Sequence, residues 1–107
     1  MVLIAQMEKR KHRRIDVSLT VTVCCEPYQY QATVTNISEK GLCIKTSMCF
    51  PVETQCKISI LGKEGVFDIQ AFVKRSNKKE GFNETMGLEL LNPSRQYREF
   101  VNTLGGV

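Results

Sequence analysis

Residues 15–25 read Ile-Asp-Val-Ser-Leu-Thr-Val-Thr-Val-Cys-Cys, and this stretch decides the fold. Its apolar positions alternate with polar ones along most of its length: Ile15, Val17, Leu19, Val21 and Val23. A period of two residues is typical of a β-strand that buries one face. Glu26-Pro27 interrupts the alternation, since proline cannot donate to a strand ladder, and the pattern resumes over residues 28–35. The two stretches together predict a β-hairpin.

Four further stretches show the same period. Alternation over residues 42–46, 56–60, 67–74 and 84–91 predicts four more strands. The sequence Gly62-Lys63-Glu64-Gly65 predicts a compact hairpin turn between two of them. We expect a loop at residues 47–53, which contain Pro51, and a polar loop at residues 76–83, which contain Gly81.

After residue 91 the period changes to that of a helix. Tyr97, Phe100, Val101 and Leu104 are spaced as on one face of an α-helix. The preceding Asn92-Pro93-Ser94 predicts a cap residue with Pro93 at the first helical position, and Gly105-Gly106 predicts the end. The predicted fold is therefore all-β, a closed or nearly closed six-stranded antiparallel β-barrel with one C-terminal α-helix across an opening. That arrangement pairs the strand edges and buries the apolar face of the helix.

The positive charge is concentrated at the N-terminus. The net charge is +4, and the first 14 residues hold five of the 15 Lys and Arg but one of the 11 Asp and Glu. We predict two parts: a flexible basic N-terminal arm, residues 1–14, and a barrel with its helix, residues 15–107. A length of 107 residues fits a single domain. An anionic partner is expected to meet the protein at the arm.

Composition excludes several classes of protein. The apolar opening, residues 1–5, is too short for a membrane span or a secretion signal, so we expect a cytoplasmic protein without membrane insertion. Five cysteines without a C-x-x-C pair argue against a disulfide framework and a zinc site, and predict reduced thiols. The single histidine, His12, has no acidic partner nearby, and no serine or cysteine has an identifiable base. We therefore predict no enzyme activity, no metal and no cofactor.

Two polar motifs remain as candidates for a binding site. The first is Arg10-x-x-x-Arg14, because planar guanidinium groups suit phosphate oxygens and the edge of guanine. The second is Asn36-x-Ser38-x-x-Gly41, in which Asn36 and Ser38 point the same way on a strand and Gly41 permits a positive φ and close approach of a ligand. Each motif also fits a simpler interpretation, a solvated tail and a side-chain-stabilised turn respectively.

The order and spacing of the two motifs resemble the PilZ family. An RxxxR motif stands before the first strand, and a [D/N]xSxxG motif begins 22 residues after Arg14, at the end of the second strand. The stretch Met86-Gly87-Leu88-Glu89-Leu90 is similar to the final strand of that family. The resemblance covers nearly the whole chain, from Arg10 to the terminal helix. It implies a six-stranded barrel with a C-terminal helix, and a receptor for cyclic di-GMP.

The resemblance also implies roles for individual residues. Arg10 and Arg14 would contact the guanine edges and phosphates of cyclic di-GMP. Asn36 and Ser38 would hydrogen-bond a guanine edge or a nearby phosphate, and Gly41 would hold the turn. Lys9 precedes the first motif arginine, at a position implied to influence whether one ligand or a stacked pair binds.

The leading interpretation is a non-enzymatic, cytoplasmic receptor of bacterial type that binds cyclic di-GMP. It would relay ligand occupancy to a downstream protein partner through ordering of its N-terminal arm. One alternative is a small β-barrel that binds nucleic acid, which is disfavoured because the chain after residue 14 carries ten charges of each sign. Another is a PilZ-like module that binds only proteins.

Overall fold

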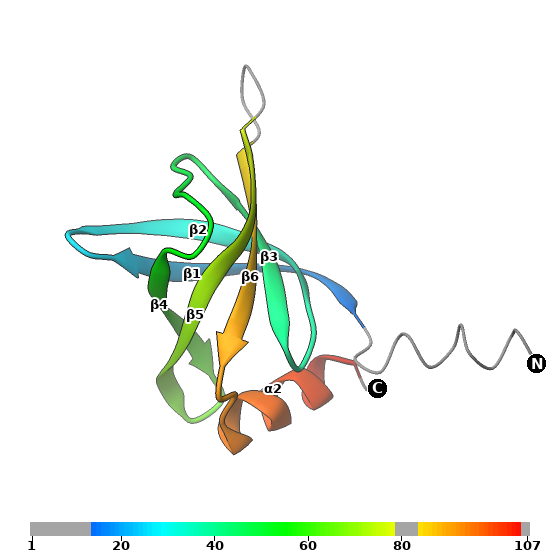
Figure 1. Cartoon of the computed structure of the whole chain (residues 1–107). Helices are drawn as coiled ribbons and strands as arrows, with labels where there is room; N and C mark the ends of the chain where they lie inside the picture. The colour runs from blue at the N-terminus through cyan, green and yellow to red at the C-terminus, as the bar shows by residue number, and fades with distance from the viewer. Residues whose placement is uncertain (1–13, 79–83, 106–107) are drawn as a thin grey trace, which may run out of the picture.

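The alternating residues form strands that curve into a barrel, as the computed structural model shows for residues 14–78 and 84–105 (Figure 1). The elements in chain order are β1 (Ile15–Cys25), β2 (Tyr28–Ile37), β3 (Gly41–Thr46), β4 (Gln55–Gly62), β5 (Gly65–Lys78), β6 (Glu84–Leu91) and α2 (Arg95–Gly105). The strands pair antiparallel in the order β1-β2-β3-β6-β5-β4, and β1 pairs with β4 to close the barrel. The predicted six-stranded barrel with a C-terminal helix is confirmed.

The inward faces of the strands form the core that the alternation predicts. Val21 and Val23 of β1 are 2% and 0% exposed, and Ala71 and Val73 on the inward side of β5 are completely buried. Helix α2 lies across one end of the barrel and adds Tyr97 to this core, with no exposed surface (Figure 1). Burial of the helix face explains why the period changes from two residues to that of a helix after β6.

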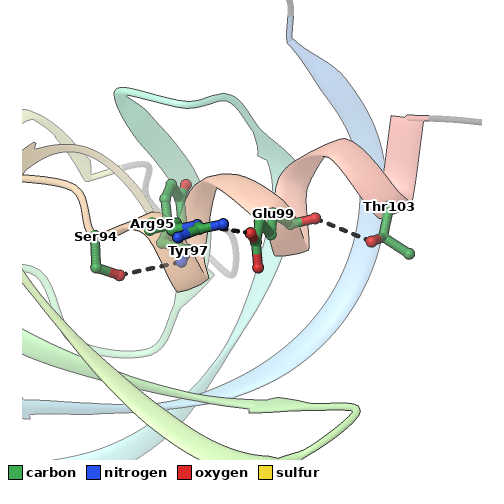
Figure 2. A network of polar contacts seen from close by, with 5 residues as sticks. All are labelled: Ser94, Arg95, Tyr97, Glu99 and Thr103. Atoms are coloured by element: carbon green, nitrogen blue, oxygen red, sulfur yellow. Dashed lines mark hydrogen bonds and ion pairs between the residues drawn. The ribbon is translucent and has the colours of Figure 1, made fainter.

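Strand β5 and helix α2 differ from their predicted boundaries. Strand β5 continues to Lys78, where a loop beginning at residue 76 was expected, because Ser76 and Asn77 still pair with β6. Helix α2 begins at Arg95 rather than at Pro93. Its cap is Ser94, whose hydroxyl accepts a hydrogen bond from the Tyr97 N–H at 3.1 Å (Figure 2).

The expectation that all five cysteines are reduced is also wrong. Cys25 and Cys56 form a disulfide, with a Cα–Cα distance of 4.6 Å. Cys24 pairs with Lys57 across the β1–β4 ladder, so the next residues along, Cys25 and Cys56, come face to face in the core. Their separation of 31 residues gives no local signal of this contact. Cys24 points to the opposite side of β1 from Cys25. Cys24, Cys43 and Cys49 take no part in the disulfide.

Helix α2 has only 11 residues, and the part of the chain described by the structure contains no helix long and apolar enough to span a membrane.

Candidate functional site

A bulge in β2 turns Asn36 out of the barrel. In the pairing of β2 with β3, Val34 lies opposite Ile44 and Asn36 lies opposite Cys43, so β2 has one residue more than β3 between these pairs. The extra residue shifts the phase of the strand. Ile37 is therefore completely buried, whereas Asn36 is only half-buried. The break in alternation seen in the sequence is this bulge.

Arg14 and Asn36 are in direct contact. Arg14 immediately precedes β1, and its Nη1 atom donates a hydrogen bond of 2.6 Å to Asn36 Oδ1. The neighbouring residues of the two strands, Asp16 and Asn36, form a ladder pair, which holds the start of β1 beside the end of β2. The structure thus brings together one residue from each of the two motifs.

Ser38 and Gly41 close a tight turn between β2 and β3. The Ser38 N–H donates to the Gly41 carbonyl at 2.8 Å, and the Ser38 hydroxyl donates to the same oxygen at 3.4 Å and accepts from the Lys40 N–H at 3.3 Å. Ser38 is 3% exposed. The Ser38 hydroxyl stabilises the turn, which is the simpler of the two interpretations of this motif.

Gly41 is required for a different reason from the one predicted. The φ angle of Gly41 is not positive. In the part of the chain that the structure covers, positive φ angles occur at Glu53, Gly65 and Asn92. A Cβ at Gly41 would lie 2.5 Å from the carbonyl oxygen of Leu88 on β6. Close packing of β3 against β6 therefore excludes a side chain here.

A second bulge places Arg75 on the outside of the barrel. The inward positions of β5 are Phe67, Ile69, Ala71 and Val73, so strict alternation would put Arg75 in the core. Instead, Val73 pairs with Leu88 and Arg75 pairs with Gly87, which gives β5 one extra residue. Lys74 and Arg75 are both exposed as a result. The Arg75 guanidinium lies close to Gly87.

The β5 bulge borders a cavity of about 240 Å³, which Arg14 and the turn after β2 also line. It is lined by four cationic side chains, one carboxylate and three other residues: Arg14, Lys40, Lys74, Arg75, Glu89, Gly41, Gly87 and Leu88. Glu89 forms an ion pair of 3.1 Å with Lys74, with exposed side-chain fractions of 42% and 62%. After that pair is discounted, three positive charges face the cavity. The lining therefore favours an anion.

Two larger cavities have a different character. One, of about 380 Å³, has Asp68 as the only charged residue in its lining. The other, of about 490 Å³, lies between α2 and the β4–β5 hairpin and is lined by Leu61, Phe67, Phe100 and Leu104 together with charges of both signs. Among residues 14–78 and 84–105, no cluster of His, Cys, Asp and Glu could hold a metal ion.

Helix α2 contacts the turn between β2 and β3 through Tyr97. The Tyr97 hydroxyl donates a hydrogen bond of 2.6 Å to the Ser38 carbonyl. Burial raises the pKa of Tyr97; the Arg14 guanidinium lowers it by a smaller amount, and Glu39 raises it further.

The structure places four of the six predicted site residues: Arg14, Asn36, Ser38 and Gly41. Lys9 and Arg10 lie outside the described residues, as does the rest of the predicted arm before Arg14. Sequence reasoning missed Lys40, Lys74, Arg75 and Glu89 as neighbours of the motif residues. Arg75 did carry a signal, since it is a charged residue in the apolar phase of β5.

Comparisons with known proteins agree with this architecture. A model of the PilZ domain family matches residues 8–104. A search of curated protein sequences gave no match.

Several solved structures share the fold. The Bacillus subtilis inhibitor of motility, MotI/DgrA, is 20% identical with a TM-score of 0.71, and the match covers 89% of this chain and 49% of that one. The present chain thus spans about half the length of MotI/DgrA. The PilZ domain of YcgR from Escherichia coli, solved with c-di-GMP, is 14% identical with a TM-score of 0.70, covering 90% and 91% of the two chains. PlzA of Borreliella burgdorferi, in complex with c-di-GMP, is 13% identical with a TM-score of 0.58, covering 96% and 54%.

Proposed function

The chain belongs to the PilZ domain family, and we propose that it is a non-enzymatic receptor for cyclic di-GMP. The ligand carries two phosphates and two guanines, and so it needs both cationic groups and planar hydrogen-bonding groups. Two of the solved structures with this fold, the YcgR domain and PlzA, contain c-di-GMP.

The contact between Arg14 and Asn36 carries the proposal. It joins the basic motif to the polar motif at 2.6 Å, at the edge of a cavity with surplus positive charge. Arginine binds phosphate and the guanine edge through planar donors, and an arginine already held by one acceptor loses less entropy on binding. A solvated tail would not need a partner on β2.

The site residues take the following roles in this proposal. Arg14 and Arg10 bind a phosphate and a guanine edge, Asn36 bonds the guanine edge, and the Ser38–Gly41 turn borders the ligand. The cavity of about 240 Å³ is smaller than the roughly 300–1,000 Å³ typical of small-molecule sites. It therefore takes only part of the dinucleotide, and the arm with Lys9 and Arg10 covers the rest.

We propose further that ligand occupancy orders the N-terminal arm and that a downstream protein recognises the ordered form. Five of the six charged residues in the first 14 are cationic, so their charges repel one another. Two bound phosphates would offset this repulsion and favour an ordered arm. The cytoplasmic location predicted from the sequence goes with this proposal, because a second messenger acts inside the cell.

Isothermal titration with cyclic di-GMP tests the proposal. We expect saturable binding to the wild type and none to the double variant Arg10→Ala/Arg14→Ala, with the circular dichroism spectrum unchanged. Titration with GMP and with a single-stranded oligonucleotide serves as the control for general anion binding. Affinity for the oligonucleotide that exceeds affinity for cyclic di-GMP, and that falls steeply with salt, would favour a nucleic-acid binder instead.

A further inference from the structure

Tyr97 connects the start of helix α2 to the turn between β2 and β3. Its backbone N–H donates to the capping hydroxyl of Ser94 at 3.1 Å (Figure 2), and its own hydroxyl donates to the Ser38 carbonyl at 2.6 Å. The side chain has no exposed surface. Both ends of this residue are therefore held, one by the helix cap and one by the turn.

Tyr97 provides one of several hydrogen bonds that hold the turn. The Ser38 N–H bonds the Gly41 carbonyl within the turn, and the Leu90 N–H of β6 donates to the Lys40 carbonyl, both at 2.8 Å. The Tyr97 contact comes from α2. Since a trans peptide is planar, holding the Ser38 carbonyl also sets the orientation of the whole peptide group between Ser38 and Glu39.

The hydroxyl and the ring of Tyr97 have different roles, since only the hydroxyl can donate a hydrogen bond to Ser38. The ring fills the end of the barrel, and a phenylalanine would fill the same space. A buried tyrosine hydroxyl needs a hydrogen-bond partner, and the buried Ser38 carbonyl needs a donor. Burial raises the pKa of Tyr97, so the hydroxyl keeps its proton and remains a donor.

We propose that Tyr97 is a positioning residue for the ligand-binding turn and couples ligand binding to helix α2 through its contact with Ser38. This inference rests on the proposed function, because it takes the Asn36–Gly41 segment as part of the cyclic di-GMP site. A ligand that holds the turn in one orientation strengthens the contact with Tyr97. Linkage then requires that a change at α2 alter the ligand affinity in return.

The test compares Tyr97→Phe with Tyr30→Phe, each of which removes one hydroxyl that donates to a backbone carbonyl. The Tyr30 hydroxyl bonds the Met48 carbonyl at 3.1 Å, and Tyr30 lies near the start of β2, at the opposite end from Ser38. We expect Tyr97→Phe to weaken cyclic di-GMP binding by about three- to tenfold and Tyr30→Phe to leave it unchanged. Thermal denaturation of both variants measures the loss of stability that they share.

Two spectroscopic measurements separate positioning from a general loss of stability. In NMR spectra without ligand, Tyr97→Phe should move the amide signals of Ser38, Lys40 and Gly41, whereas Tyr30→Phe should not. Saturating cyclic di-GMP should slow amide exchange across α2 in the wild type, and slow it less in Tyr97→Phe. The β1–β2 hairpin around residues 25–28, which lies away from α2, is the internal reference for exchange (Figure 1).

The outcomes distinguish this inference from the proposed function. If the wild type binds cyclic di-GMP but the two variants bind it equally well, the coupling is overturned and the receptor function stands. If the wild type does not bind the ligand, both fail. If Tyr97→Phe does not fold, exchange in the wild type decides alone: slowing at α2 without slowing at the hairpin supports the coupling, and equal slowing or none overturns it.

Discussion

The Arg75 side chain lies over Gly87, and a Cβ added at Gly87 would lie 2.9 Å from both the Nε and the Nη2 atom of Arg75. Both residues line the cationic cavity beside Arg14. The guanidinium is thus held against a stretch of β6 that lacks a side chain. Glycine within a strand often marks such a close approach.

Gly87→Ala is expected to weaken cyclic di-GMP binding about as much as Arg75→Ala, roughly tenfold, because the added methyl group displaces the guanidinium from the cavity. Isothermal titration measures both. Lys57→Ala removes one exposed charge from β4, away from the cavity, and should have no effect. Normal binding by Gly87→Ala together with weak binding by Arg75→Ala would show that Gly87 does not position the arginine.

Arg14→Lys is expected to weaken binding by about tenfold although it keeps the charge. Lysine lacks the planar donors that can hold Asn36 and a ligand at the same time. The matched control is Arg98→Lys on α2, where the Arg98 guanidinium donates to the Pro93 carbonyl at 3.1 Å. Ligand titration of both variants at equal ionic strength gives the comparison, and equal affinities would contradict a specific role for the Arg14 guanidinium.

Gly41→Ala is expected to lower the free energy of unfolding by about 1–3 kcal/mol, because its Cβ would meet the backbone oxygen of Leu88. Backbone can move aside only if β3 and β6 separate. Gly87→Ala meets the far end of a flexible side chain instead and should cost far less stability. Urea denaturation of the two variants tests the contrast, which fails if they are equally destabilised.

The free energy of unfolding should fall as the pH rises above about 10. Burial raises the pKa of Tyr97 above its usual 10.0 in the folded state, so the unfolded chain loses this proton first. For one group the slope is about −1.4 kcal/mol per pH unit between the two pKa values. Tyr97→Phe should remove that part of the slope, measured by urea denaturation at a series of pH values. Identical slopes for variant and wild type would show that Tyr97 does not contribute.

Reduction of the Cys25–Cys56 disulfide should lower the free energy of unfolding by about 3–4 kcal/mol, since the bond closes a loop across 31 residues. The double variant Cys25→Ala/Cys56→Ala should be insensitive to the reductant. Thiol titration of the unfolded protein gives an independent check. It should find three thiols before reduction and five after it, whereas five before reduction would mean that the bond is absent.

The strands and the helix could be predicted because burying one face of an element requires a regular spacing of apolar residues. The sequence also marked the β2 bulge, since Ile37 is out of phase with Val34. The β5 bulge could not be predicted in the same way, because the polar residues from Ser76 onward are typical of a loop. Arg75 then stood at an apparent strand end, where its charge required no explanation.

The rest of the site depends on which strands are neighbours. Lys40, Lys74 and Glu89 come from three segments that meet because β6 lies between β3 and β5. No local spacing encodes that order. The same holds for Cys25 and Cys56, which meet because β1 pairs with β4 to close the barrel.

That closure is short: β1 and β4 share three residue pairs, from Thr22–Ser59 to Cys24–Lys57, whereas β4 and β5 share eight. Within residues 15–21 of β1, strand pairs are made along one edge only, with β2, and a register shift interrupts them between Asp16 and Leu19. Local unfolding of a barrel begins where the fewest hydrogen bonds must break. The disulfide holds one end of β1, so transient opening starts at the other end, beside Arg14. The start of β1, which follows the motif arginine, is therefore held by fewer strand pairs than the end that the disulfide fixes.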